Sequence, residues 1–337
     1  MNLAAIQAEQ ERNMLRAFRE AIQGIRDSVT LNEVTRALET GNIDAAVRLL
    51  QIEPAAFQGL EEAAREAYRT GGMTGAEQIG QIPTSDGRIV ARFNVRSPRA
   101  ERWLLAESSR LVVEISEQQR GMARAVLTES MAQGANPRAA ALDIVGRVDS
   151  RTRRRTGGFI GLTDRQTSWV QNARSELNQL NPEYFNRELR DRRFDAAVAR
   201  AIRDGEPLPQ RTIDNAITNM QARAQRYRGE VIARTESINA LRAGQFESIQ
   251  QALETEGVGQ AEAVKVWDSS GDARTREEHA AADGQSVPVS QPFIVGGEAL
   301  MYPGDPAGSA ANTIQCRCTM RTEINFGAIA KRLEGFG

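Results

Sequence analysis

The residue types best suited to metal or acid–base chemistry gather near one end of the chain. His279 is the chain's single histidine, and Cys316 and Cys318 are its two cysteines. Imidazole nitrogen and thiolate sulfur are ligands that zinc and similar borderline metals prefer. All three lie within about 40 residues of one another, a spacing that suits a site assembled by folding rather than by a single helix.

This spacing raises the hypothesis of a structural zinc site. If residues 316–321 form a strand, Cys316 and Cys318 point to the same face and offer two thiolates to one ion. His279 would be the third ligand and the carboxylate of Asp272 the fourth, in a closed tetrahedral site. The alternative interpretation is two small buried cysteines and a histidine hydrogen-bonded to Asp283.

A catalytic interpretation uses the same region. Asp272, His279 and Asp283, with Arg274 and Arg276, make a cluster of acids, a base and cations such as a metal-dependent nuclease or related hydrolase would use. The chain has no glycine-rich phosphate loop, and the nucleophile would have to be water or a cysteine that is already a ligand. A structural role therefore ranks above an enzymatic one, and we do not expect an enzyme.

A second candidate site is basic. Arg151, Arg153, Arg154 and Arg155 precede a glycine pair and could grip a nucleic-acid backbone. No aromatic residue lies within the run to stack on bases, and such runs are often simply solvated or paired with acidic neighbours. Both interpretations stay open.

The elements around the first site predict a small, turn-rich α+β C-terminal module over residues 261–337. Residues 263–268 alternate like a strand, 275–282 read as a short helix, and 287–290, 292–295 and 316–321 read as further strands. Asp283-Gly284 and Pro303-Gly304-Asp305-Pro306 are turn signals.

The fold class is mainly α, with a long-helix body over about residues 1–260. We expect a helical hairpin array at 1–80, with a glycine-rich loop at 70–75, and a helical body at 81–260 that includes helices over 98–131 and 212–256. We also expect a turn at 85–87, a strand-like stretch at 88–96, and a boundary between the helical body and the C-terminal module at 257–259. Arg234 and Glu236 are two apart and cannot face each other on a helix. Each is expected to have a structural role, pairing either with residues three or four positions away or with another segment.

Composition narrows the class of protein. The 337 residues are 40% apolar and carry a net charge of -1, so no global field draws the protein to nucleic acid or membrane. Lysine occurs only at Lys265 and Lys331, and the arginine excess reflects either genome composition or contact with phosphate and carboxylate. Two cysteines as Cys-x-Cys indicate a reducing compartment or a metal. We see no secretory signal and no apolar run long enough to span a bilayer, so we expect no membrane anchor.

The C-terminal residues also resemble a known family, the phage minor head or head morphogenesis proteins typified by the F protein of phage Mu. That family has a Trp-Asp pair, a D-x-R-x-R-x-x-H-x-x-x-D-G run, a Pro-Phe pair, a P-G-D-P turn and a terminal C-R-C. The matching residues here are Trp267, Asp272, Arg274, Arg276, His279, Asp283, Gly284, Pro292, Phe293, Pro303, Gly304, Asp305, Pro306, Cys316 and Cys318. Gln315 departs from the pattern, because an asparagine commonly precedes C-R-C. The stretch 232–236 usually precedes the module in this family, and the resemblance covers most of residues 90–321.

The resemblance implies a low-copy protein of the virion head, located at the portal vertex and assembled in the host cytoplasm. The implied partners are the portal protein, on whose ring it would be oligomeric, then capsid or scaffolding protein, and packaged DNA. The implied roles are head morphogenesis and an effect on DNA packaging or ejection. The family is not an established enzyme class.

Overall fold

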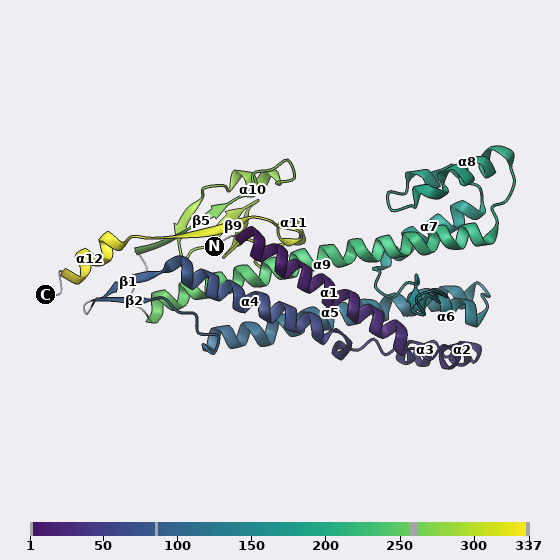
Figure 1. Cartoon of the computed structure of the whole chain (residues 1–337), viewed down its shortest axis with the longest axis horizontal. Helices are drawn as coiled ribbons and strands as arrows, with labels where there is room; N and C mark the ends of the chain where they lie inside the picture. Colours follow the sequence, from purple (N-terminus) through teal and green to yellow (C-terminus); the bar gives the residue numbers. More distant parts are fainter. Residues whose placement is uncertain (1–2, 85–86, 256–261, 335–337) are drawn as a thin grey trace. The chain divides into compact units, whose positions relative to one another are not determined.

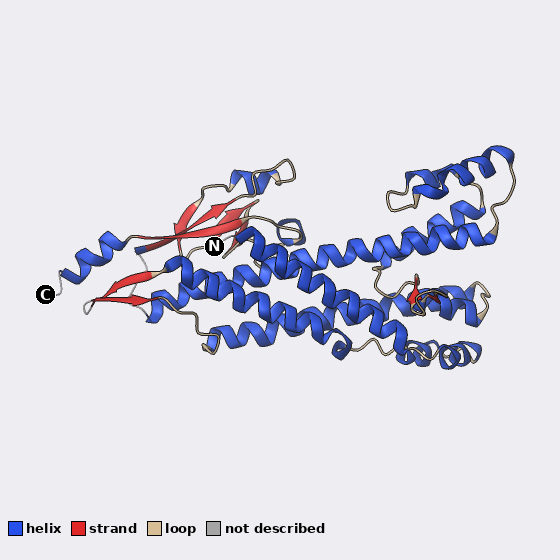
Figure 2. Cartoon of the chain, in the orientation of Figure 1, coloured by secondary structure: helices blue, strands red, loops and turns tan. Residues whose placement is uncertain are grey.

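The computed structural model describes residues 3–84, 87–255 and 262–334, and it is mainly α-helical with short strands near the C-terminus (Figures 1 and 2). The predicted turn at Ser85-Asp86 and the predicted boundary at 257–259 lie outside the described residues. The α-helices are α1 (Leu3–Ser28), α2 (Leu31–Glu39), α3 (Ile43–Leu49), α4 (Gln58–Ile79), α5 (Pro98–Ala132), α6 (Pro137–Val145), α7 (Asp164–Asn178), α8 (Asp195–Asp204), α9 (Gln210–Thr255), α10 (Glu277–Ala281), α11 (Ala310–Thr313) and α12 (Phe326–Glu334).

The strands form small antiparallel sheets. Their bounds are β1 (Gln81–Thr84), β2 (Gly87–Val90), β3 (Arg147–Val148), β4 (Arg155–Thr156), β5 (Ala263–Asp268), β6 (Ser286–Pro288), β7 (Phe293–Val295), β8 (Glu298–Leu300) and β9 (Thr319–Ile324). In the C-terminal region the order is β6-β5-β9, with Trp267 paired to Met320, while β7 and β8 form a separate hairpin. The fold class predicted from the sequence, a long-helix body followed by a small α+β module, is confirmed. None of the helices in the described part of the chain has a stretch long and apolar enough to cross a membrane.

Many element boundaries follow from local chemistry. Asn42 caps α3 by accepting the amide hydrogen of Ala45, and Thr163 and Gln166 form a capping box at the start of α7. Pro98 occupies the first position of α5, where its missing N–H costs nothing. The start of α5 lies where the sequence predicts it, and α9 runs unbroken over nearly the whole of the predicted 212–256 range.

The predicted loop at 70–75 is wrong, because these residues lie inside α4. The three glycines that suggested a loop are close-packing positions instead. A Cβ on Gly71 would lie 1.9 Å from the carbonyl oxygen of Leu241, and a Cβ on Gly244 would lie 2.0 Å from that of Tyr68. The glycines therefore let α4 and α9 approach with their backbones nearly in contact, and the packing outweighs the poor helix propensity of glycine. Of the strand-like stretch predicted at 88–96, only the part up to Val90 belongs to a strand, β2.

The described chain divides into two compact units, neither of which is continuous in sequence. Unit 1 comprises 1–16, 60–110 and 231–337, and unit 2 comprises 17–59 and 111–230. Unit 1 draws on all three of the ranges predicted as domains, so the division at residues 80 and 260 stays a prediction.

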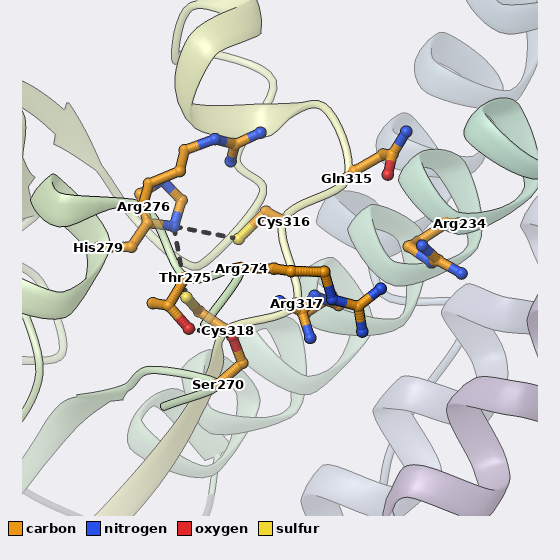
Figure 3. A pocket seen from close by; sticks show the side chains of 10 residues that line it. All are labelled: Arg234, Ser270, Arg274, Thr275, Arg276, His279, Gln315, Cys316, Arg317 and Cys318. Atoms are coloured by element: carbon orange, nitrogen blue, oxygen red, sulfur yellow. Dashed lines mark hydrogen bonds between the residues drawn. The ribbon is translucent and has the colours of Figure 1, made fainter. Parts of the chain in front are cut away.

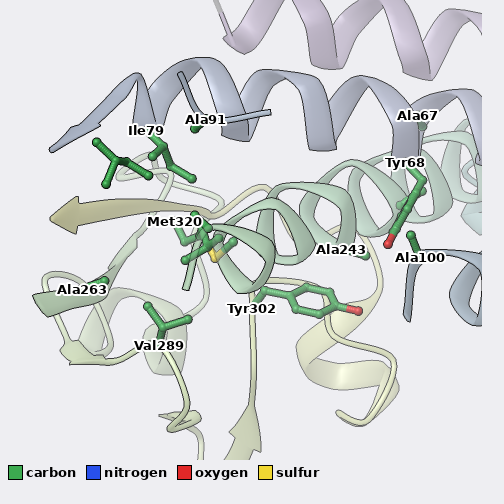
Figure 4. Close-up of a cluster of buried hydrophobic side chains, with 14 of the residues drawn as sticks. Ala67, Tyr68, Ile79, Ala91, Ala100, Ala243, Ala263, Val289, Tyr302 and Met320 are labelled. Atoms are coloured by element: carbon green, nitrogen blue, oxygen red, sulfur yellow. The ribbon is translucent and has the colours of Figure 1, made fainter. Parts of the chain in front are cut away.

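The core of unit 1 lies around the C-terminal part of α9 (Figure 4). Ala240 and Ala243 of α9, Tyr68 of α4 and Met320 of β9 are buried in one cluster with Tyr302. Tyr68 stacks on Trp103 with ring centroids 4.2 Å apart. Because α9 and the β5–β9 sheet share this core, the C-terminal module folds onto the helix that precedes it.

Unit 2 is held together around the glycine-rich loop at 157–161. Buried Gln119 donates to the carbonyl oxygen of Leu162 at 2.6 Å and accepts from the amide of Gly161 at 2.6 Å. Gly158 has φ +78, and a Cβ there would lie 2.4 Å from the amide nitrogen of Gly146. The loop thus requires glycine both for its backbone conformation and for its closeness to α6.

A candidate metal centre

The side chains of His279, Cys316 and Cys318 meet in unit 1, as the sequence predicted (Figure 3). Their ligand atoms all lie within 4.8 Å of one another, and all three residues are buried. His279 Nδ1 lies 3.3 Å from Cys318 Sγ and 3.7 Å from Cys316 Sγ. Among the residues the structure describes, this is the one group of three or more His, Cys, Asp or Glu side chains close enough to hold a metal ion.

The imidazole of His279 is oriented by a buried amide. Its Nε2 lies 3.2 Å from Asn312 Oδ1, and Asn312 Nδ2 donates to the carbonyl oxygen of Val295 at 3.2 Å. Because the amide oxygen must accept, Nε2 carries the hydrogen and Nδ1 is left with a lone pair facing the two sulfurs. Trp267 packs edge-on against the imidazole at 5.7 Å between centroids. The alternative interpretation of the sequence required a hydrogen bond between His279 and Asp283, but His279 bonds to Asn312 instead. In many metal sites the ring nitrogen that does not bind the metal is fixed by a hydrogen bond in the same way.

The two cysteines do not lie on a strand, which corrects the prediction for 316–321. They lie between α11 and β9, and β9 begins only at Thr319. Gln315 has φ 55, and its amide donates to Thr235 Oγ1 of α9 at 3.1 Å. This left-handed residue turns the chain so that both sulfurs face His279. Asparagine adopts this conformation more readily than glutamine does, which gives a physical reason for the asparagine that commonly stands here in the resembling family.

The electrostatic surroundings favour the thiolate form of Cys316 but not that of Cys318. Arg242 of α9 is completely buried, and its Nε lies 3.4 Å from the carbonyl oxygen of Cys318. Burial lowers the pKa of Arg242 to about 10, so it stays charged at neutral pH, and the charged groups that act on it are Cys316, Cys318 and Asp268. The Cys318 thiol donates to Cys316 and, with Arg276 and Arg242 nearby, lowers the pKa of Cys316 to about 7, while the same contact raises the pKa of Cys318.

Asp272, the predicted fourth ligand, is not brought into the group. Its carboxylate makes a two-point ion pair with Arg317, including Nη2 to Oδ1 at 2.6 Å, and Arg274 lies 3.7 Å away. The guanidinium of Arg317 holds the pKa of Asp272 well below its usual range. Asp283 instead accepts from the amide of Ser269 at 2.7 Å. The three residues of the predicted nuclease centre therefore do not converge, and that alternative gains no support from the geometry.

The remaining motif residues assemble the module. Gly284 has φ 72 and donates its amide hydrogen to Trp267, closing the turn after α10. The Asp305 carboxylate accepts from the amides of Met301 and Ala307, which fixes the Pro303-Gly304-Asp305-Pro306 turn. Gly304 lies against Asn239 of α9, where a Cβ would be 2.2 Å from an atom of the side-chain amide.

The stretch 232–236 lies under the module. Thr235 receives the Gln315 hydrogen bond, and Arg234 pairs with Glu11 of α1 at 3.4 Å. These contacts show how the helix segment that precedes the module is joined to it. Sequence reasoning gave no role to Asn312, Arg242 or Thr235, because only the folded chain brings them to the cysteines and the histidine.

A pocket of about 130 Å³ opens beside the three candidate ligands (Figure 3). His279, Cys316 and Cys318 form part of its lining. The rest of the wall, as formed by the described residues, is polar and without a carboxylate: Arg234, Ser270, Arg274, Thr275, Arg276, Gln315 and Arg317.

The second predicted site, the arginine run, lies in unit 2 on the hairpin of β3 and β4. Asp149 accepts from the amides of Arg151 and Thr152 and so closes the turn. Arg151, Arg153 and Arg154 are exposed, and Arg155 donates to the carbonyl oxygen of Gly146 at 3.2 Å. The ion pairs of the described residues include none of these four arginines. The arginine run thus forms the exposed turn of a β-hairpin rather than an irregular loop.

Comparison with known proteins identifies the class of this region. Residues 192–321 match the family described as Phage Mu protein F like protein. The match covers α8, α9 and the module through Arg321, which confirms the resemblance seen in the motifs. This part of the chain is therefore similar to phage Mu protein F. Searches of curated proteins and of solved structures gave no match. The resemblance predicted for residues 90–191 lies outside the matched range and stays a prediction.

Proposed function

We propose that the protein is a minor head protein of a tailed phage that associates with the portal vertex and acts in head morphogenesis. The observation that carries this proposal is the family match over residues 192–321, which contains both the module and the helix on which it is packed. Its role is structural rather than catalytic. The partners are the portal protein, on whose ring it is oligomeric, together with capsid or scaffolding protein and packaged DNA.

The proposal also gives the module a structural zinc ion, held by His279, Cys316 and Cys318. The grouping of three ligand atoms, the Nε2 hydrogen bond to Asn312 and the nearby Arg242 support it. Zinc bound there would link α10 to the segment before β9, and its binding free energy would add to the stability of the module. The exposed arginine hairpin is the segment of this chain best placed to contact packaged DNA, where it would affect packaging or ejection.

The location is tested by quantitative mass spectrometry of purified virions and of particles emptied of DNA. We expect a few copies per portal ring in full virions. Retention in emptied particles indicates a portal-bound protein, and loss indicates a protein ejected with the DNA. Absence from both kinds of particle would contradict a virion location.

The metal is tested by elemental analysis of the purified protein. We expect about one zinc per chain, lost in His279→Ala and in Cys318→Ser. Asp272→Asn is the matched control, because the structure pairs Asp272 with Arg317 rather than with the ligands, and it should keep its zinc. Loss of zinc in the control would make Asp272 a ligand after all, and a zinc-free wild-type protein would contradict the centre.

The structural role is tested with the same variants. Wild-type protein and His279→Ala are incubated with DNA and divalent metal, and we expect no cleavage that depends on His279. Cleavage by the wild type that is lost in the variant would contradict the structural role and restore the hydrolase interpretation.

A further inference from the structure

The candidate centre provides three ligands, whereas zinc in proteins is nearly always four-coordinate. Among the described residues, no further His, Cys, Asp or Glu belongs to the group of His279, Cys316 and Cys318. Each of the three also lines the same pocket. The remaining position of a bound metal is therefore open to a ligand that enters through this pocket.

The pocket wall selects for negative charge. Four arginines line it, namely Arg234, Arg274, Arg276 and Arg317, and none of the carboxylates in the described part of the chain does. Arg317 and Arg274 share Asp272, and Arg234 pairs with Glu11. Arg276 donates to the backbone carbonyl of Ile314, and it is in none of the ion pairs among described residues. Guanidinium groups bind oxyanions through paired N–H donors, so the wall is built from the groups that recognise phosphate.

The buried positive charge of Arg242 also favours an anionic ligand. A zinc ion with two thiolates and a neutral imidazole carries no net charge. Arg242 lies behind the cysteines, fully buried, with one guanidinium nitrogen lacking any hydrogen-bond partner among the described residues. A buried cation needs compensating charge. The charges that act on Arg242 are those of Cys316, Cys318 and Asp268, and a bound metal would neutralise the two thiolates. An anion on the open position would add to the compensation that Asp268 provides, whereas water would add none.

We propose that the open metal position and the arginines of the pocket wall together bind a phosphate oxyanion. One phosphate oxygen would complete the metal's coordination, and Arg276 and Arg274 would bind the others. The inference rests on the metal centre proposed above. The shared chemistry is that of a phosphate group, whether free or in a nucleic-acid backbone.

The test uses full-length protein in which cobalt(II) replaces zinc, because the visible ligand-field bands of cobalt report its fourth ligand. Titration with inorganic phosphate should shift these bands to saturation. Arg276→Gln and Arg274→Gln should each weaken the apparent phosphate affinity about tenfold or more, the effect expected for loss of one charge-assisted contact. Arg321→Gln is the control, because Arg321 lies in the same module outside the pocket lining and pairs with Glu323.

The outcomes separate the two proposals. Protein that binds cobalt with thiolate charge-transfer bands, but whose spectrum phosphate leaves unchanged, overturns the phosphate site and keeps the metal centre. Protein that takes up no cobalt overturns both. An equal loss of affinity in Arg321→Gln would reveal nonspecific attraction and overturn the site. If Arg276→Gln does not bind cobalt, the phosphate site is tested by comparing the apparent phosphate affinity of Arg274→Gln with that of the wild type.

A second titration identifies the source of the phosphate. A short single-stranded oligonucleotide without terminal phosphates should displace inorganic phosphate if the site accepts a nucleic-acid backbone. A response to inorganic phosphate alone supports the site with free phosphate as its ligand.

Discussion

Two fully buried cations, Lys265 and Arg242, lie in the C-terminal half of unit 1. Lys265 on β5 donates to the carbonyl oxygen of Met301 at 2.6 Å, and its ammonium lies 4.8 Å from the ring centroids of both Phe246 and Phe293. These contacts partly replace water around the charge. Burial nevertheless lowers the pKa of Lys265 to about 8, so keeping it protonated in the folded state costs free energy.

This cost gives a pH dependence with a defined sign. Between about pH 8 and the lysine's ordinary pKa, the unfolded chain binds more protons at residue 265 than the folded one, so stability rises with pH there. We expect the unfolding free energy of the wild type, relative to Lys265→Met, to increase by about 1 to 3 kcal/mol between pH 7.5 and pH 10. Chemical denaturation at several pH values measures it. Lys331→Met, at the exposed lysine of α12, should show no such increase, and a flat difference for Lys265→Met would refute the prediction.

At the scale of single residues, the sequence identified the candidate metal ligands but not the residues that contact and orient them. His279, Cys316 and Cys318 were recognisable because each type is rare in the chain and suits a metal. Asn312 and Arg242 belong to common residue types, and their roles arise only from distances that the fold sets. Asp272 was predicted as a ligand from its type, whereas in the structure a nearby guanidinium binds it, which no spacing rule could show.

At the scale of elements, the close contact of α4 and α9 depends on small residues from both helices. Gly71 and Gly75 of α4 and Gly244 of α9 each lie where a Cβ would come within 2.1 Å of the other helix. Helix periodicity located most of these elements correctly, because one apolar face per helix is buried. It failed at 70–75 because local propensity disfavours glycine in helices, while the partner helix that needs the glycines lies far away in sequence.

We expect Gly244→Ala to lower the unfolding free energy by about 1 to 3 kcal/mol or more, because the added methyl would clash with the α4 backbone. Gly121→Ala is the matched control. Gly121 is also in a helix interior, but a Cβ there meets nothing within 4 Å, so alanine should stabilise by up to about 1 kcal/mol. Thermal or chemical denaturation distinguishes the two. Similar effects at both positions would show that the close contact is unimportant.

The β3–β4 hairpin is the element that we predict to bind DNA. Its exposed arginines would release counterions from DNA, so Arg153→Gln with Arg154→Gln should weaken binding and lower the slope of log affinity against log salt by up to about 2. Fluorescence anisotropy with duplex DNA over a range of salt measures both. The control pair is Arg193→Gln with Arg203→Gln, exposed arginines that already face Asp191 and Asp204. An unchanged slope in the hairpin variant would argue that the run is only a solvated turn.

At the scale of the whole molecule, the compact units cut across the order of the sequence. α9 contributes residues 210–230 to unit 2 and residues 231–255 to unit 1. Unit 1 also takes in residues 1–16 and 60–110, which the sequence assigned to other parts of the chain. Linear cues such as glycine-rich stretches mark where elements end, but they do not indicate which distant elements share a core.

This organisation predicts which part of the chain loses stability when the metal is removed. All three candidate ligands, the β5–β9 sheet and α10 belong to unit 1, so the binding free energy of zinc acts on the stability of that unit. After chelation, we expect faster amide hydrogen exchange in α10, β5 and β9, whereas α6 and α7 of unit 2 keep their protection. Cys318→Ser in the presence of zinc should reproduce this pattern, and Asp272→Asn should not. If exchange instead rose equally in both units, the metal would stabilise the chain as a whole, and if exchange did not change, the three ligands would not form a structural centre.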